Sequence, residues 1–389
     1  MKASDLLPGR DYLLDDSREA TVVNATPVPD GRPNQRKVLV TIDGEEEYIL
    51  PRQIATAKPI VTKTVKPLPT KKVVRRSLAL DDPRLDMFRP DPSVVETYVS
   101  RKMANGQRDI DYFLECWRRK ENVLLVGDTQ AGKSLLVRVL AVLAGNVMGL
   151  GKPLPVFTLS GSSGITDFDL FGQPQSWTDD DGKERLVWLP GVVDLASRVG
   201  GILDLDEIGM MGERVTSSLH PVCDWRRMFV NRNKPVLVPG DGFMPEQVKV
   251  SDDLWIVATT NPSTYRGSGT LNEAFANRFR HIMWDYDESV EKVLIRNEGV
   301  LALGEALRNA RAVNHVRTPI GTAALIRCAQ DVERDGVDMA LFCLVSMFTS
   351  DERPVVNEII ESRSYRGLIS KAASDGGSIF DLPDEDQPF

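Results

Sequence analysis

Two glycines, a lysine and a serine within eight residues form the group of side chains in this chain that is best suited to binding phosphate. The stretch 127–134 reads Gly-Asp-Thr-Gln-Ala-Gly-Lys-Ser and lies between an apolar run, Val123–Val126, and a run with helical periodicity, Leu135–Leu140. Glycines at both ends let the backbone turn tightly, so that several N–H groups and a helix N-terminus can meet phosphate oxygens together. Lys133 is expected to reach the β- and γ-phosphates of a nucleotide, and Ser134 to bind Mg²⁺.

The position of this loop, after a strand and before a helix, is the context that a phosphate-binding motif requires. That context disfavours an ordinary glycine-rich turn. We therefore predict that the loop binds a nucleoside triphosphate together with Mg²⁺. The residues expected to contact the nucleotide are Gly127, Asp128, Thr129, Gln130, Ala131, Gly132, Lys133, Ser134 and Leu135.

Two adjacent carboxylates, Asp206 and Glu207, end the apolar stretch 201–205. At the end of a strand both can border one site, where Asp206 is expected to hold Mg²⁺ and Glu207 to orient and polarise an attacking water. An Asp-Glu pair at a strand end can equally be structural, but the phosphate loop favours the hydrolytic interpretation. Asp204 is an acid in a strand that we expect to be buried, and the pattern gives no reason for it.

An asparagine and two arginines extend this group of candidate residues. Asn261 follows the apolar run Trp255–Thr259 and is expected to reach the γ-phosphate or the attacking water, although an Asn-Pro pair also commonly begins a turn. Arg278 and Arg280 follow a short helical stretch. Phosphoryl transfer leaves charge on the γ-phosphate that a guanidinium can neutralise, often from a neighbouring subunit, whereas most surface arginines are simply solvated.

Strands that alternate with helices are predicted to position these residues. Helical spacing indicates one helix through Val94–Val99 and another through Ile110–Trp117. Such alternation is typical of an α/β fold whose parallel sheet has its ligand at the carboxyl ends of the strands. The predicted strands are Val123–Val126, Val156–Leu159, Ile202–Leu205, Trp255–Thr259 and His281–Trp284.

The N-terminal part of the chain has a different pattern. Within residues 10–57, short β-branched or alternating runs, Ala20–Asn24, Lys37–Ile42 and Glu46–Leu50, are separated by turn residues, which predicts a small antiparallel meander or barrel. The next stretch, Lys58–Arg76, holds seven basic residues and no acid. An extended linker is favoured because its prolines and like charges disfavour packing, and a strip that contacts a nucleic-acid backbone is the alternative.

Composition sets broad limits on the class of protein. The chain has 389 residues, 42% of them hydrophobic, and a net charge of −8. This negative net charge argues against a protein that coats nucleic acid non-specifically, but it does not exclude a local basic surface, because patches rather than total charge determine binding. The four cysteines, Cys116, Cys223, Cys328 and Cys343, are far apart and are expected to be buried thiols in a reducing compartment. No run approaches the roughly 18 apolar residues of a membrane span, and the N-terminus lacks a signal-peptide core, so we expect a cytoplasmic protein with no membrane contact.

The order of these motifs resembles that of the AAA+ ATPases, and within them the MoxR-type branch, which carries a hairpin inserted in its second helix. The resemblance covers about residues 90–335. Besides the phosphate loop, the stretches that carry it are 169–172 (DLFG), 189–193 (LPGVV), 201–208, 258–262 (ATTNP) and 274–279 (AFANRF).

The resemblance implies a role for each candidate residue. Lys133, Asp206 and Glu207 would take the Walker roles with ATP and Mg²⁺ as cofactors, and Asn261 would be the residue called sensor 1. Arg278 looks like an arginine finger that acts across a subunit interface, with Arg280 as a weaker second candidate. A finger that completes a neighbour's site implies a homo-oligomeric ring, typically a hexamer.

The chain departs from the family pattern in the helical lid domain that is predicted after Tyr286. Thr318 and Pro319 are expected to be the N-cap and first turn of a helix that ends at Gly336. The family commonly places a nucleotide-sensing arginine, called sensor 2, early in this helix, where the present chain has Ile320. Arg317 is the nearest substitute, and the sensor 2 position stays unassigned.

Two insertions are expected in the α/β domain. Residues 175–188 are predicted to form a hairpin that matches the family's insert, and Phe229–Lys249 a second insertion before Asn261. Trp177 and Trp188 are expected to pack across the first hairpin, the alternative being that they face a central pore or a partner. Candidate partner contacts near the second insertion are Arg226, Arg227, Arg232 and Lys234.

The last residues are acidic and end in Asp384-Glu-Asp-Gln-Pro-Phe389. An acidic solvated tail is the simpler interpretation. The terminal six residues also resemble the tip of bacterial single-stranded DNA-binding proteins, which docks replication and repair enzymes. That resemblance implies a role in DNA metabolism.

The predicted organisation has five parts: a small N-terminal β domain (1–57), a basic proline-containing linker (58–90), an α/β ATPase domain (91–286), a helical lid domain (287–372) and an acidic tail (373–389). The leading hypothesis is a ring-forming ATPase that remodels an as yet unknown protein or nucleoprotein client. One alternative is an ATP-driven nucleic-acid motor that uses the Lys58–Arg76 strip and recruits replication proteins through its tail. Another is a nucleotide-switched scaffold whose turnover is incidental. A monomeric kinase is disfavoured by the Asp206-Glu207 pair.

Overall fold

The computed structural model describes residues 11–14, 19–29, 36–42, 45–49, 54–57, 79–179, 182–238, 242–262 and 271–375. The chain divides into two compact units, Met1–Arg75 and Arg76–Phe389. Two features singled out in the sequence lie outside the described residues, namely the entire Lys58–Arg76 strip and the tail from residue 376 onward. The five predicted domain boundaries stay predictions.

The N-terminal unit contains an antiparallel five-stranded sheet with the order β4-β3-β2-β1-β5. Its strands are β1 (Asp11–Leu14), β2 (Glu19–Pro29), β3 (Arg36–Ile42), β4 (Glu45–Ile49) and β5 (Ile54–Ala57). The segment β2–β3–β4 is the predicted meander, and its buried residues include Val40, Ile42 and Ile49. The sequence pattern did not indicate the short strands β1 and β5.

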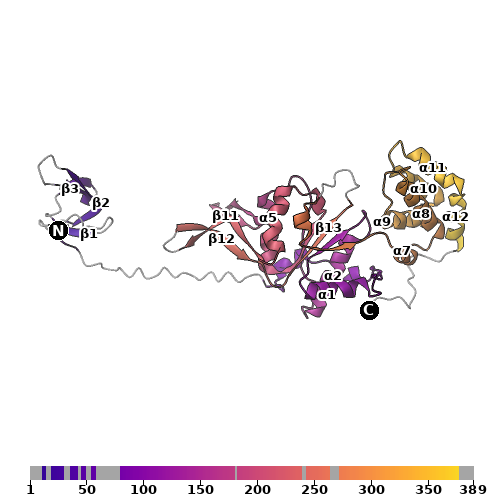
Figure 1. The fold of residues 1–389 in the computed structure, drawn as a ribbon, viewed down its shortest axis with the longest axis horizontal. Helices are drawn as coiled ribbons and strands as arrows, with labels where there is room; N and C mark the ends of the chain where they lie inside the picture. Colours follow the sequence, from indigo (N-terminus) through magenta and orange to yellow (C-terminus); the bar gives the residue numbers. More distant parts are fainter. Residues whose placement is uncertain are drawn as a thin grey trace. The chain divides into compact units, whose positions relative to one another are not determined.

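The larger unit is built on a five-stranded parallel sheet with the order β14-β6-β13-β10-β7 (Figure 1). Its strands are β6 (Val123–Val126), β7 (Val156–Ser160), β10 (Gly201–Asp206), β13 (Leu254–Thr260) and β14 (Arg280–Met283). Each of the five predicted strands is present. The structure therefore confirms the expected α/β class.

Both faces of this sheet are covered by helices, so apolar residues alternate between two cores along each strand. On β10, Leu203 and Leu205 pack on one side with α4 and α5, while Ile202 packs on the other side with α1 and α2. The helices of this domain are α1 (Asp109–Arg118), α2 (Lys133–Val147), α3 (Asp167–Phe171), α4 (Val192–Val199), α5 (Glu213–Cys223) and α6 (Glu273–Ala276). Three short 3₁₀ helices span Pro83–Phe88, Pro92–Val95 and Ile208–Met210.

Two antiparallel hairpins leave the α/β layer. The first pairs β8 (Gln173–Thr178) with β9 (Glu184–Leu189), and the second pairs β11 (Met228–Val238) with β12 (Gly242–Lys249), as Figure 1 shows for the latter. Trp177 is 61% exposed, so its expected packing across the first hairpin is wrong. Trp188 is half-buried and lies beneath the ammonium of Lys234 from the second hairpin, 5.6 Å from the ring centroid.

The C-terminal helices form the bundle for which we keep the name lid. They are α7 (Glu288–Leu294), α8 (Glu298–Ala312), α9 (Thr322–Asp335), α10 (Val337–Ser346), α11 (Arg353–Ser362) and α12 (Tyr365–Asp375). Helix α9 ends at Gly336 as expected, but it begins at Thr322 with Gly321 as N-cap. The predicted start at Thr318 is wrong because the hydroxyl of Thr318 donates instead to the buried carboxylate of Glu352, at 2.6 Å.

Two other expectations fail. The helix predicted through Val94–Val99 is only a 3₁₀ turn that ends at Val95, after which the chain runs without helix toward the loop pocket described below. Cys116, Cys223 and Cys328 are buried thiols as expected, whereas Cys343 is exposed on α10. Among the described residues, no helix combines the length and the apolar character needed to cross a bilayer.

Candidate functional site

The predicted phosphate loop connects the carboxyl end of β6 to the start of α2. Its backbone explains the glycines: Gly132 is the N-cap of α2 with φ of +84°, and a Cβ on Gly127 would lie 1.9 Å from the carbonyl oxygen of Trp284. A residue with a side chain at either place would be strained or would clash. The N-terminal amides of a helix such as α2 have no partner within the helix, so this geometry suits an anion.

Lys133 is the first residue of α2 and is 92% buried, with 8% of its surface exposed. Its Nζ donates to the carbonyl oxygens of Gly127 and Asp128, both at 2.7 Å, and to Oδ1 of Asn261 at 3.2 Å. Burial lowers the pKa of Lys133, and the nearby carboxylates of Asp206, Asp128 and Glu207 act in the opposite direction. The Lys133 ammonium therefore already lies at the loop, next to the place where a bound phosphate would be.

The two predicted acids at the end of β10 are held by the neighbouring strand β13. Thr259 Oγ1 donates to Asp206 Oδ1 at 2.6 Å and accepts from the amide of Glu207 at 2.9 Å. Asn261 Nδ2 donates to Glu207 Oε1 at 3.1 Å. The structure thus brings Lys133, Asn261 and Glu207 into one hydrogen-bonded chain, although they are far apart in the sequence.

Thr259 is a functional candidate that the sequence analysis missed. Its position at the carboxyl end of a predicted strand next to Asn261 was the signal that could have found it. Glu207 itself has φ of +50°, in the left-handed region, which is uncommon for a residue with a side chain. Backbone strain of this kind clusters at active sites, where surrounding contacts such as those of Thr259 hold it in place.

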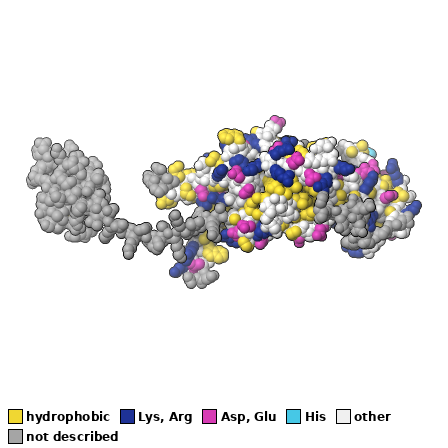
Figure 2. Space-filling model, turned by 90° about the horizontal axis from the view of Figure 1, so that it is seen from below, with side chains coloured by type: hydrophobic (Ala, Val, Ile, Leu, Met, Phe, Trp, Pro, Cys, Tyr) yellow, Lys and Arg dark blue, Asp and Glu magenta, His cyan; other side chains and the backbone are white. Residues whose placement is uncertain are grey.

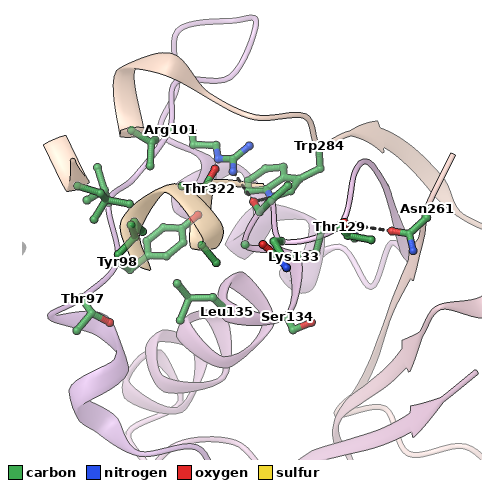
Figure 3. A pocket seen from close by; sticks show the side chains of 18 of the residues that line it. Thr97, Tyr98, Arg101, Thr129, Lys133, Ser134, Leu135, Asn261, Trp284 and Thr322 are labelled. Atoms are coloured by element: carbon green, nitrogen blue, oxygen red, sulfur yellow. Dashed lines mark hydrogen bonds between the residues drawn. The ribbon is translucent and has the colours of Figure 1, made fainter. Parts of the chain in front are cut away.

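A pocket of about 400 Å³ lies above the loop. Figure 3 shows Lys133 and Ser134 at the start of α2, with Asn261 at the right of the view and Thr322 of the lid above Lys133. Asp206 and Ser134 both line this pocket. One hydroxyl and one carboxylate suit Mg²⁺, which in nucleotide sites is bound by one or two side chains plus substrate phosphates and water.

The other wall of the pocket comes from residues that the sequence analysis did not assign. The guanidinium of Arg101 lies over the indole of Trp284, 4.1 Å from the ring centroid (Figure 3). It donates to the carbonyl oxygens of Asp285 and Ala131, at 2.6 and 2.5 Å, and burial lowers its pKa. Tyr98, also in the pocket, is fixed by a hydrogen bond to the buried Asp109. Within the run Val94–Val99, Tyr98 and Val99 line this pocket, whereas Val94 and Val95 belong to the preceding 3₁₀ turn.

Arg278 does not line this pocket. It borders a different cleft, of about 760 Å³, where its Nε lies 3.7 Å from a carboxylate oxygen of Asp224. Arg280 borders the same cleft, and its Nε forms an ion pair with Oε2 of Glu121 at 2.7 Å. Of the predicted catalytic residues, the structure therefore brings together Lys133, Glu207 and Asn261, and leaves Arg278 apart from them.

Asp204, which the sequence left unexplained, lies on β10 and is 5% exposed. Its Oδ2 accepts from Thr158 Oγ1 at 3.3 Å, and its Oδ1 has no partner among the described residues. Burial, with a contribution from the charge of Asp206, raises the pKa of Asp204 to about 7. The acid can thus remain protonated in the sheet near neutral pH.

Neither lid residue that was considered for nucleotide sensing reaches the pocket. Ile320 is buried in the core of the lid. Arg317 forms an ion pair with Asp351 on the lid surface, so its suggested role as substitute is wrong. The lid residues that do line the pocket include Val290, Leu294, Thr322 and Ile326.

Comparison with known proteins shows a partial match to one domain family. Residues 122–279 match the model of the AAA domain, dynein-related subfamily. An uncharacterized protein of Staphylococcus epidermidis is 26% identical over 253 residues, which cover 64% of this chain and 89% of that protein. The denitrification regulatory protein NirQ of Pseudomonas aeruginosa is 25% identical over 250 residues, covering 61% of this chain and 86% of NirQ.

Among solved structures, NtrX from Brucella abortus in complex with ADP is similar over 72% of this chain, at 17% identity and a TM-score of 0.31. The matched region spans about half of that protein, 52% of its chain. A TM-score this low supports no conclusion. The family match, which covers the loop, the acid pair and Arg278, agrees with the parallel sheet and the site at its carboxyl edge. The α/β domain thus has the AAA+ P-loop fold, and residues 122–279 within it are similar in sequence to the AAA domain, dynein-related subfamily.

Proposed function

We propose that this chain binds ATP with Mg²⁺ and hydrolyses it within an oligomeric ring in order to remodel a protein or nucleoprotein partner. The observation that carries the proposal is the hydrogen-bonded chain from Lys133 through Asn261 to Glu207. It joins a phosphate-binding cation, a polar amide and a candidate base in one pocket. This is the set of groups that positions and polarises a water against a γ-phosphate.

Each residue has a separate role in the proposed reaction. Lys133 binds the β- and γ-phosphates, and Glu207 accepts a proton from the attacking water while Asn261 keeps its carboxylate oriented. Thr259 positions both acids through its single hydroxyl. Mg²⁺, held by Ser134 and Asp206, would neutralise charge on the phosphates.

The separation of Arg278 from the pocket supports the ring. A finger that borders a different cleft can complete the site of another copy but not its own. A hexamer and the MoxR-type branch stay predictions from the family resemblance, as does the cytoplasmic location. The apolar side chains exposed on the two hairpins, Trp177, Leu186, Leu237 and Phe243, are candidates for contact with a client.

The test is ATP turnover measured against protein concentration, with particle images recorded with and without ATP. We expect turnover per subunit to rise steeply with concentration as rings form, because a finger in trans needs a neighbour. Full turnover by a chain that stays monomeric at every concentration would overturn the proposal.

A nucleic-acid motor is the second candidate, favoured by the seven cations of the Lys58–Arg76 strip. On the face shown in Figure 2, Lys and Arg side chains are interspersed with Asp and Glu, which gives that face no single-sign field. The measurement that separates the two candidates is stimulation of turnover by single-stranded DNA at increasing salt. Stimulation that falls steeply with ionic strength would favour the motor, and the absence of stimulation would favour remodelling of a protein.

A further inference from the structure

An ion pair connects the lid directly to the phosphate loop. Arg311 of α8 places Nη1 2.7 Å from Oδ2 of Asp128, the second residue of the loop, and the two side chains are 24% and 19% exposed. The carbonyl oxygen of Asp128 also accepts from Nζ of Lys133. The lid arginine and the phosphate-binding lysine are therefore joined to the same loop residue.

The next two loop residues are contacted as well. Tyr286, which leads into the lid, donates from its hydroxyl to the carbonyl oxygen of Thr129 at 2.9 Å. Gly321, at the start of α9, lies so close to the loop that an added Cβ would be 2.5 Å from Cβ of Gln130. Residues 128–130 thus form a continuous contact with the lid and with the segment that leads into it.

Helix α8, which carries Arg311, is held in the lid by hydrogen bonds and a ring contact of Arg308. One turn earlier, Arg308 donates to both carboxylate oxygens of the buried Glu291 of α7, at 2.7 and 2.6 Å, and stacks over Tyr286 at 4.0 Å. Glu291 also accepts from the hydroxyl of Thr322 at the start of α9, at 2.6 Å. Because residues three apart share a helix face, this network presents Arg311 toward the loop and Thr322 toward the pocket as one unit.

The ion pair between Arg311 and Asp128 matters for nucleotide binding because Asp128 carries a negative charge. The loop wraps the site of a triphosphate, and a carboxylate there repels the ligand unless a cation neutralises it. Asp128 is close enough to Lys133 to act on the pKa of that lysine. Without Arg311, the negative charge of Asp128 would compete with the phosphates for Lys133.

We propose that Arg311 is a positioning residue of the nucleotide site: it neutralises Asp128 and couples the lid to the phosphate loop, so that the lid follows nucleotide occupancy. This inference rests on the proposed ATP binding. It assigns to α8 the sensing role that neither Ile320 nor Arg317, which both precede α9, can perform.

The test is a double-mutant cycle in the full chain with Arg311→Ala, Asp128→Asn and the two combined. Affinity for Mg-ADP and for a slowly hydrolysed Mg-ATP analogue is measured by calorimetry. We expect Arg311→Ala to weaken binding about tenfold in the wild-type background, within the range of coupled contacting pairs, and by less than about threefold in the Asp128→Asn background. Arg311→Lys, which keeps the charge, should stay within about threefold of wild type.

A structural role alone would not produce this pattern or change the response of the lid. Hydrogen exchange in α8 is therefore compared with and without nucleotide, and we expect nucleotide to protect α8 in the wild type but not in Arg311→Ala. The matched control is Arg334→Ala, which removes an exposed arginine that pairs with Asp331 and Asp335 on α9. An equal penalty for Arg311→Ala in both backgrounds, or unchanged protection of α8, overturns this inference while ATP binding stands. A wild-type chain that binds neither nucleotide overturns both.

Discussion

Arg278 and Lys133 lie at opposite ends of one pair of strands. β14 begins with Arg280 opposite Val123, the first residue of β6, and Asn122 donates to the carbonyl oxygen of Arg278 just before this pairing starts. The phosphate loop leaves β6 after Val126, three residues further on, which is about 10 Å of strand. The parallel pairing therefore places the arginine and the loop at opposite edges of the sheet, so in the proposed mechanism the finger comes to this site from a second subunit.

The first prediction concerns that second subunit. Subunits with Arg278→Ala lack the finger but keep the base, and subunits with Glu207→Gln keep the finger but lack the base. Each variant alone should lose nearly all turnover, and mixing them should restore a fraction of it, because some interfaces then join an intact base to an intact finger. Steady-state ATP hydrolysis across a series of mixing ratios measures this.

The control mixes Arg278→Ala subunits with subunits that carry both substitutions, so that no interface contains a finger. That mixture should stay inactive at every ratio. Equal recovery in the two series, or none in either, would contradict a finger in trans.

The second prediction concerns Lys133. Its ammonium is buried against loop carbonyls and lies near four carboxylates, so Lys133→Ala removes the main cation from the place where phosphate charge would lie. We expect affinity for Mg-ATP to fall at least about tenfold, since hydrogen bonds that involve a charged group contribute about 1.5–3 kcal/mol. Lys152→Ala, which removes a half-buried lysine that pairs with Asp86, is the control. Binding by Lys133→Ala that equals that of the control would reject the phosphate-loop assignment.

The third prediction separates positioning from binding at Thr259. Thr259→Val keeps the shape but removes the hydroxyl that links Asp206 to the backbone of Glu207. We expect kcat to fall about tenfold or more with little change in nucleotide affinity, because misplacement of a catalytic group costs rate rather than ground-state binding. Thr259→Ser restores the hydroxyl and should recover most of kcat. Thr216→Val, at a buried threonine on α5 away from the site, is the matched control, and a loss as large as that of Thr259→Val would assign the effect to packing.

The sequence predicted the sheet and the loop well because their signals are local. β6 occupies the predicted Val123–Val126 without any shift, and Asn261 reaches Glu207 because parallel strands end at one edge. The partner of a polar side chain, in contrast, depends on residues that fold next to it. Thr318 has the local pattern of an N-cap, but Glu352, 34 residues later, binds its hydroxyl and amide and leaves Gly321 to begin the helix. The contact between Arg311 and Asp128 joins residues 183 positions apart and had no local signal.

The fourth prediction follows from Glu352. This carboxylate is 4% exposed and accepts hydrogen bonds from the amide and hydroxyl groups of Thr318 and Thr349 and from the amide of Arg317. Burial alone would raise the pKa of Glu352, but these hydrogen bonds outweigh it and hold the pKa at about 2, below the ordinary value of 4.5. A pKa lowered by folding means that the ionised form stabilises the lid. The stabilisation is complete above about pH 4.5 and is lost as the pH falls toward about 2.

Glu352→Gln should therefore lower the free energy of unfolding at pH 7 by about 1–3 kcal/mol, as expected when a buried charged hydrogen-bond acceptor is replaced by a neutral one. The difference between variant and wild type should shrink between pH 4.5 and pH 2, because the wild type also loses its charge there. Denaturant unfolding followed by circular dichroism over this pH range measures it. Glu358→Gln, at an exposed position of the neighbouring turns of α11, should change the free energy of unfolding by less than about 0.5 kcal/mol at any pH. If the difference in the free energy of unfolding between Glu352→Gln and the wild type stays constant from pH 7 to pH 3, the shape of the side chain rather than its charge stabilises the start of α9.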